Sequence, residues 1–307
     1  MMGAEFRRLR RREGASLKDV AGGVVSLGAL SKFESGTADV PINKLCVMLD
    51  RMGVSLQEFV SGFDPLVGNS NSLMPTVNKL SAQHDVPGLK VLVMMAQERY
   101  VRRWTPIDFQ QLVIAAGAYF ALTQDNLLST EQEQTLSTWF SPQVRWTEAN
   151  VVAFRYGCVL LSPLVCYQVA TRLFGKVHAV YSVNHSLSTA AWEAVLSADC
   201  WLVQSGEITL AKRLTEKVQQ GVIPANASLV EYRREFIARC LAYRIEPSTA
   251  RAESITGLIS FLRTIGSVSL AQSYRDTAQR LCGTDLYAQV PQPEPATDAV
   301  GEVADAN

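Results

Sequence analysis

The sequence contains few of the residues from which metal sites and disulfide frameworks are built. Among its 307 residues are only 6 cysteines and 3 histidines, and no two cysteines have the Cys-X-X-Cys spacing of a zinc site. Isolated cysteines in apolar segments are usually small buried side chains. We therefore expect no metal site and no cofactor.

Two further absences restrict the class of protein. The longest apolar run, CVLLSPLVCY at residues 158–167, is too short to span a bilayer, and no apolar segment follows the N-terminal arginines as in a secretion signal. The Gly-X-Ser-X-Gly, phosphate-loop and His-Glu-X-X-His patterns of common enzyme sites are also absent. The sequence predicts a cytoplasmic protein that is neither an enzyme nor bound to a membrane.

The patterns of β-structure are missing too, since there is no Asn-Gly turn and no useful alternation of apolar and polar residues. Hydrophobic residues instead recur at intervals of three and four. Helices are expected to begin near residues 105, 129, 147, 163, 187, 206, 226, 248 and 267. Every second start is separated by about 40 residues, a period typical of stacked helix pairs. We therefore predict an all-α protein whose larger part is a tetratricopeptide-like α-solenoid with a concave face.

Changes in composition divide the chain into four parts. Five short helices are expected first, then a connection that contains GNSNS, then the helical repeats, and last a segment rich in proline and acidic residues. The predicted parts are a helix-turn-helix domain at 4–62, a connection at 63–86, a regulatory and dimerisation domain at 87–287, and a disordered tail at 288–307.

The first part has the spacing of a helix-turn-helix. Ser16 and Asp19 form a capping-box pattern that opens a scaffold helix over Leu17–Gly22. Ser26 can cap a second helix over 26–35, which Gly36 closes. The helix crossing needs a small residue and apolar neighbours, and these are supplied by Ala21, Val20, Leu30 and Phe33.

Charge is concentrated at this end of the chain. The formal net charge of the whole chain is zero, but residues 1–32 carry 7 lysines and arginines against 3 acidic residues. Such a basic segment on an acidic remainder indicates that only the first domain meets a polyanion. Double-stranded DNA is the expected partner.

Candidate DNA contacts follow from position. Five arginines wrap around the first helix, so some must point to solvent or toward an acid; Arg10 and Arg12 are predicted to contact phosphates. The amides at the start of the scaffold helix, with Ser16 and Lys18, are predicted to hold a phosphate. The second helix is predicted to read DNA. Leu27 and Ala29 would touch thymine methyl groups, and Ser26 and Ser31 would offer hydroxyl groups. Gly28 would allow close approach, and Lys32 would offer a positive charge. For Lys32, plain solvent exposure is the alternative.

Several stretches resemble one family. AEFRRLRRREGASLKDVA, LSKFESGTADVPINKL and LDRMGVSLQEFV are similar to the Cro/C1-type head of the Rgg/GadR/MutR transcriptional regulators, and RWTEANVVAF at 145–154 is similar to a helix start in that family's second domain. The resemblance implies a homodimeric DNA-binding regulator. It also implies that the helical-repeat domain responds to a short hydrophobic peptide inside the cell, as in quorum sensing.

The peptide-binding candidates are polar or aromatic residues within apolar helices: Tyr119, Asn150, Arg155, Tyr156, Asn184 and Arg233. Asparagine amides suit a peptide backbone, and arginine suits a terminal carboxylate; exposure on the outer face or helix capping is the alternative for each. Cys46 is expected either to form an intersubunit disulfide or to be a buried thiol. The alternative functions are a DNA-tethered protein-interaction scaffold and a regulator without a peptide ligand.

Overall fold

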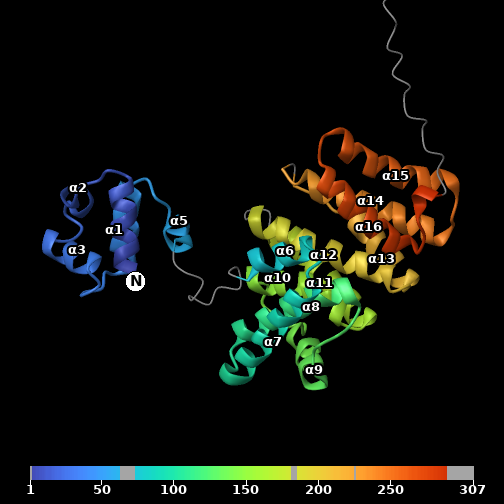
Figure 1. Ribbon diagram of the computed structural model, residues 1–307, viewed down its shortest axis with the longest axis horizontal. Helices are drawn as coiled ribbons and strands as arrows, with labels where there is room; N and C mark the ends of the chain where they lie inside the picture. Colours follow the sequence, from blue (N-terminus) through green and yellow to red (C-terminus); the bar gives the residue numbers. More distant parts are fainter. Residues whose placement is uncertain (1, 63–72, 181–184, 225, 289–307) are drawn as a thin grey trace, which may run out of the picture. The chain divides into compact units, whose positions relative to one another are not determined.

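The computed structural model describes residues 2–62, 73–180, 185–224 and 226–288. Every regular element in these ranges is a helix, which confirms the all-α prediction. The chain divides into two compact units, residues 1–73 and 74–307, and Figure 1 shows the helices of each.

The first unit contains five short helices, as the sequence predicts. They are α1 Met2–Arg12, α2 Leu17–Ala21, α3 Leu27–Glu34, α4 Ile42–Arg51 and α5 Leu56–Ser61. The first helix begins at Met2, and Gly3 in its first turn packs directly on the end of α3. A Cβ on Gly3 would lie 1.7 Å from the carbonyl oxygen of Phe33, so only glycine fits there.

Aromatic and aliphatic side chains form the core of this unit. Phe6 packs edge-on against Phe33 and Phe59, with ring centroids 5.5 and 6.1 Å apart. The helix-turn-helix positions that the sequence predicts to be buried are indeed buried, namely Val20, Ala21, Leu30 and Phe33. α1 therefore holds α3 and α5 on either side of one hydrophobic core.

The ends of α2 and α3 are capped as predicted. The Ser16 side chain accepts the amide proton of Asp19 while the Asp19 carboxylate accepts that of Ser16, a complete capping box. Ser26 caps α3 by accepting from the amide of Ala29 at 3.1 Å. Gly36 has a φ of 74° and donates to the carbonyl of Phe33 at 2.9 Å, which ends α3 in a left-handed turn.

A buried ion pair fastens α3 to α1. Arg10 donates from Nε and Nη2 to the two carboxylate oxygens of Glu34 at 2.6 and 2.9 Å, and from Nη1 to the carbonyl of Ala15 at 2.8 Å. Donating these hydrogen bonds to the Glu34 carboxylate raises the pKa of Arg10. The predicted phosphate contact of Arg10 is therefore wrong, because the guanidinium is buried and all three of its nitrogens already donate inside the fold.

The second unit consists of eleven α-helices within its described residues. They are α6 Met74–Ala82, α7 Val86–Arg103, α8 Pro106–Thr123, α9 Thr130–Trp139, α10 Glu148–Gly157, α11 Pro163–Val180, α12 His185–Gln204, α13 Ile208–Gln219, α14 Ser228–Ile245, α15 Thr249–Thr264 and α16 Val268–Cys282, with short 3-10 turns at η2 Cys158–Leu160 and η4 Leu286–Ala288. The observed starts of α8 to α16 lie within two residues of the expected ones.

These helices stack as an α-solenoid. α8 packs on α10, α10 on α12, α12 on α14 and α14 on α16, so every second helix belongs to one continuous row. α7, α11, α13 and α15 pack against this row. The row of even-numbered helices provides the inner face on which the candidate ligand site lies.

The predicted connection at residues 63–86 is too long. Residues 74–82 form α6, in which Pro75 occupies the first turn and Val77 is fully buried, and α6 packs on α7 and α8. The polar GNSNS run at 68–72 made the whole segment look like a connection in the sequence, so the helix that follows the run was not predicted. Residues 63–72 and 289–307 lie outside the described ranges.

One glycine controls how closely α8 and α10 approach. A Cβ on Gly117 would lie 2.0 Å from the carbonyl oxygen of Tyr156, so the two backbones are in direct contact at this point. No other residue type fits without moving the helices apart.

We expect Glu34→Gln to destabilise the protein by about 3–5 kcal/mol, because it leaves the buried guanidinium of Arg10 without its counter-charge. Urea unfolding of the intact chain, followed by circular dichroism, would measure the change. Glu58→Gln is the matched control: it removes an ion pair with Arg12 that is about half-exposed, and should cost less than about 1 kcal/mol. Equal effects of the two changes would contradict the assigned role.

A second buried carboxylate predicts a pH dependence. Asp199 on α12 is 1% exposed and accepts a hydrogen bond from the Thr215 hydroxyl on α13 at 3.0 Å. Burial raises the pKa of Asp199 from 3.8 to about 7. The folded state therefore binds this proton more tightly than the unfolded state, so the free energy of unfolding should fall as the pH rises from about 4 to about 7.

Asp199→Asn should remove this contribution and stabilise the protein at pH 8 by as much as about 4 kcal/mol, with little change at pH 4. Thermal unfolding between pH 4 and pH 8 tests it, and Asp125→Asn, at an exposed position, is the control. Parallel pH profiles for the wild type and Asp199→Asn would show that the carboxyl group is ionised throughout.

Candidate functional site

The exposed side of α3 is open, and its side chains have no hydrogen-bond or ion-pair partner in the part of the chain that the structure describes, apart from the Ser26 cap. Leu27 is 51% exposed, and Gly28, Ser31 and Lys32 are exposed beside it while Leu30 and Phe33 point into the core. A Cβ on Gly28 would meet nothing within 4 Å. Lys32 makes no ion pair with any described residue. This surface, defined by Leu27, Gly28, Ser31 and Lys32, is named the α3 face.

The two predicted serines at helix starts differ in what they leave free. Ser26 only accepts a hydrogen bond, from the Ala29 amide, and Ala29 itself is half-buried. Ser16 donates its hydroxyl proton to the Asp19 carboxylate at 2.5 Å, and this hydrogen bond lowers the pKa of Asp19. The prediction that Ser16 donates to a phosphate is therefore corrected, because its proton is used in the cap and a carboxylate lies beside it. Lys18 remains an exposed cation there.

The four remaining arginines of α1 fall into two groups. Arg8 pairs with Glu5 at 2.6 Å. Arg12 pairs with Glu13 at 2.6 Å and with Glu58 at 2.7 Å, so it contacts carboxylates in the folded chain. Arg7 and Arg11 are exposed and form no ion pair with described residues. Arg7 follows Gly3 by one helical turn and so lies on the flank of α1 that faces α3. Sequence reasoning missed both residues, although their spacing from Gly3 could have indicated them.

Cys46 is a free, half-buried thiol on α4. The single chain does not distinguish its two predicted roles, the intersubunit disulfide and the buried thiol, so both stay predictions.

The inner face of the second unit contains a groove. Two adjoining cavities of about 210 and 330 Å³ share the side chains of Arg155, Cys200, Arg233 and Arg280. A third hollow of about 960 Å³, beside α6 and α16, also includes Arg280. These residues come from α10, α12, α14 and α16, four successive helices of the inner row. We name this surface the inner groove.

The groove has more cations than anions. Glu193 accepts a hydrogen bond from Arg233 and lies 3.4 Å from the Nη2 of Arg155. Arg233 also donates to the Ser197 hydroxyl at 3.1 Å. Arg280 donates to Thr277 at 3.1 Å and has no ion pair among the described residues. Arg155 and Arg233 thus contact one carboxylate, Glu193, while Arg280 does not, and Asp276 lines the third hollow.

Aromatic groups complete the lining. Trp201 packs edge-on against Phe120 at 5.5 Å, and its indole Nε1 is buried without a hydrogen-bond partner among described residues. Phe236 and Tyr274 form a similar pair at 4.7 Å. The groove can therefore accept apolar side chains, a backbone carbonyl and an anionic group.

The predicted peptide residues have different positions. Arg155, Tyr156 and Arg233 line the inner groove, and the Tyr156 hydroxyl donates to Asn78 of α6 at 3.2 Å. Burial raises the pKa of Tyr156. Glu193, Trp201 and Arg280 were missed by sequence reasoning, since no local pattern connects residues that meet only across helices.

Two candidates are corrected and one lies outside the described residues. Asn150 accepts from Gln110 at 2.8 Å and from the Trp139 indole at 3.0 Å, and donates to the Arg145 carbonyl at 2.7 Å, so its amide serves the packing of α8, α9 and α10. Tyr119 is 6% exposed and does not line the cavities. Asn184 is not in the described ranges.

The described residues contain no group of three or more metal-ligating side chains. No helix that the structure describes is long and apolar enough to cross a bilayer.

No protein-family model matches the sequence, and no curated protein matches it. Solved structures match the fold. The Streptococcus dysgalactiae SHP pheromone receptor Rgg2 is similar over 91% of this chain and 99% of its own, with a TM-score of 0.66 and 15% identity.

Two further structures agree. A proposed transcriptional regulator from Listeria monocytogenes EGD-e has a TM-score of 0.65 and 17% identity over 94% of this chain and 99% of its own. The PrgX/cCF10 complex has a TM-score of 0.62 and 10% identity over 96% of this chain and 94% of its own. At such identities the likeness establishes the fold: the chain has the two-part helical architecture of these proteins along nearly its whole length.

Proposed function

We propose that this protein is a sequence-specific DNA-binding transcriptional regulator whose second unit binds a short intracellular peptide, as in quorum sensing. The observation that carries the proposal is the fold likeness to the pheromone receptor Rgg2, which includes 91% of this chain and 99% of that one. The α3 face and the inner groove supply surfaces for the two ligands.

The α3 face suits DNA by its chemistry. The exposed Leu27 offers an apolar contact for a thymine methyl group, Ser31 offers a hydroxyl, and Lys32 offers a charge for a phosphate or a base edge. Since no side chain projects at Gly28, the helix can approach the groove floor closely. Few bidentate base contacts are available, so we expect DNA shape to contribute much of the specificity.

The phosphate contacts are reassigned accordingly. Arg7 and Arg11 are exposed on α1 without internal ion pairs, and Lys18 is exposed at the start of α2. We infer that these cations, with Arg12 if its carboxylate contacts are exchanged, neutralise the backbone on either side of the reading helix. A homodimer would place two such heads on two half-sites.

The inner groove suits a peptide that carries a carboxylate. Arg280 has no internal ion pair, so it is the group available to bind a terminal or side-chain carboxylate. The unpartnered indole N–H of Trp201 can donate to a peptide carbonyl, and the rings of Phe120 and Phe236 can pack on apolar side chains. Peptide binding would then favour one relative placement of the two DNA-binding heads.

The alternative of a DNA-tethered scaffold requires a broad charged surface. The narrow, aromatic-lined groove, with cavities of about 210 and 330 Å³, favours a small extended ligand instead.

In selection from random DNA duplexes with the intact protein, Gly28→Gln should change the preferred sequence, because a hydrogen-bonding side chain is added to the open α3 face. Lys32→Ala should weaken binding to all sequences alike and lower the salt dependence by about one counterion. Lys212→Ala, at an exposed position in the second unit, is the control. If neither change on α3 alters DNA binding, α3 is not the reading helix.

Fluorescence polarisation with labelled hydrophobic octapeptides would test the groove. We expect Arg280→Gln to weaken binding of a peptide with a free carboxylate by at least about tenfold, since a charge-assisted hydrogen bond is lost, and to leave the amidated peptide unaffected. Arg275→Gln lies on the same helix but outside the groove, where it faces the ring of Tyr287, and is the matched control. Failure of every peptide in a broad library to bind would favour a regulator without a peptide ligand.

A further inference from the structure

A hollow of about 440 Å³ opens between α7, the start of α9 and the loop that joins α8 to α9. It shares no lining residue with the inner groove. One wall consists of Gln97, Tyr100, Val101 and Trp104, whose spacing of three, one and three places them on one side of the last two turns of α7. The volume lies in the range typical of small-ligand sites.

Trp104 presents an exposed aromatic ring at this wall. The residue is 66% exposed, and its ring centroid lies 5.2 Å from that of Tyr100, with 35° between the ring planes. Its backbone has a φ of 50°, in the left-handed region that bulky residues rarely adopt, and its amide donates to the Tyr100 carbonyl at 2.8 Å. Residues held in such conformations cluster at ligand sites.

The opposite wall is held in place by internal hydrogen bonds. The Gln97 side chain donates to the Leu127 carbonyl at 2.8 Å and so ties the loop to α7. Ser129 and Gln132 form a complete capping box at the start of α9. Both walls are therefore formed by the chain itself, and a ligand does not have to order them.

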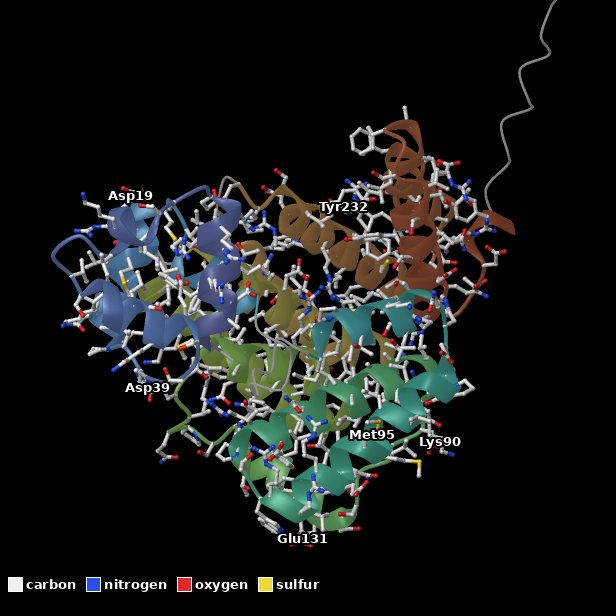
Figure 2. All side chains as sticks on the ribbon, turned by 60° about the vertical axis from the view of Figure 1, so that its left-hand side comes forward. Asp19, Asp39, Lys90, Met95, Glu131 and Tyr232 are labelled. Carbon is white, nitrogen blue, oxygen red and sulfur yellow. The ribbon has the colours of Figure 1, made fainter. Side chains whose placement is uncertain are left out.

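Of the residues that line the hollow, Glu131 alone is charged. It lies in the first turn of α9, where Figure 2 labels it, and it forms no ion pair within the part of the chain that the structure describes. Burial raises the pKa of the Tyr100 hydroxyl, and the charge of Glu131 raises it further. The field of the carboxylate therefore reaches into the hollow.

These features select the charge of a ligand. An anion would be repelled by Glu131 and by the negative faces of the aromatic rings. A wholly apolar ligand would remove the Glu131 carboxylate from water without giving it a partner. A cation is attracted both by the carboxylate and by the ring face of Trp104.

We propose that this hollow binds an organic cation carried on an apolar stem, with its guanidinium or ammonium group between the Trp104 ring and the Glu131 carboxylate. The stem lies along Val101 and Leu128, in the way that long cationic side chains bury their methylene groups while the charge stays near water. A free guanidine or amine and the arginine or lysine side chain of a polypeptide present this same chemistry. The site goes beyond the proposed function, since neither the α3 face nor the inner groove contributes to it.

Fluorine NMR of the intact protein labelled with 5-fluorotryptophan provides the test, because the Trp104 signal is identified by its absence from Trp104→Phe. N-acetyl-arginine methylamide should shift this signal to saturation. N-acetyl-citrulline methylamide has the same shape without the charge, and should bind at least about tenfold more weakly. Equal binding of the two compounds, or no saturable shift with either, would overturn the proposal.

Two further ligands separate the possible sources of the cation. Butylguanidinium represents the free small molecule, and a blocked peptide with one arginine between leucines represents a polypeptide. Equal affinities would support a free cation as the ligand. Binding of the peptide at least about tenfold tighter would support a polypeptide, whose flanking side chains then add contacts.

Substitutions locate the ligand, with binding of butylguanidinium followed through its own NMR signals. Trp104→Ala should weaken binding at least about fivefold, while Trp104→Phe should retain part of it because a ring face remains. Glu131→Gln should weaken binding about two- to fivefold. Glu148→Gln, which removes an exposed carboxylate in the first turn of α10, is the matched control and should bind as the wild type does.

Trp104 and Glu131 are both exposed, so each variant should keep the circular dichroism spectrum of the wild type. If folded Trp104→Ala and Glu131→Gln both bind the cation with wild-type affinity, the ligand lies elsewhere and the proposal is overturned. That result would leave the DNA and peptide proposals intact.

Discussion

A carboxylate that is removed from water must pair with a cation or take up a proton. This constraint shapes both candidate binding surfaces, the α3 face and the inner groove. Glu34 meets this constraint through Arg10, and the pair holds α3 on α1. Glu193 meets it through Arg155 and Arg233, and so fixes two of the three guanidinium groups of the inner groove. Asp199, which has only a threonine hydroxyl as its partner, is driven toward its protonated form instead.

This constraint separates structural cations from those available to ligands. On α1 the buried Arg10 holds α3 in place, while Arg7 and Arg11 remain in solvent. In the inner groove Arg155 and Arg233 are engaged by Glu193, while Arg280 is not. In each unit the internal ion pair orients helices and leaves a neighbouring cation unneutralised, which gives both surfaces a preference for anionic groups without leaving a buried charge unpaired.

Much of the fold follows from the sequence because helix starts depend on local signals. Ser16, Ser26 and Thr105 cap the helices that their positions indicate, and apolar spacing locates the buried faces. The sites were less predictable. The partners of Arg10 and Asn150 are up to 24 and 40 residues away, and whether a long polar side chain turns inward depends on what tertiary packing brings beside it. The role of Arg280 depends on the same long-range packing, so no local pattern could reveal it.

The contact between Gly117 and Tyr156 has a consequence for how the repeat unit can change shape. Because the backbones of α8 and α10 touch there, any movement that brought a side chain to the place of Gly117 would drive it into the carbonyl oxygen of Tyr156. α8 and α10 are therefore expected to move together as one rigid body. Arg155 and Tyr156 belong to α10 and so to this rigid pair, whereas Arg233 lies on α14 and Arg280 on α16. Flexing of the solenoid on the C-terminal side of α10 would therefore change the width of the groove rather than its floor.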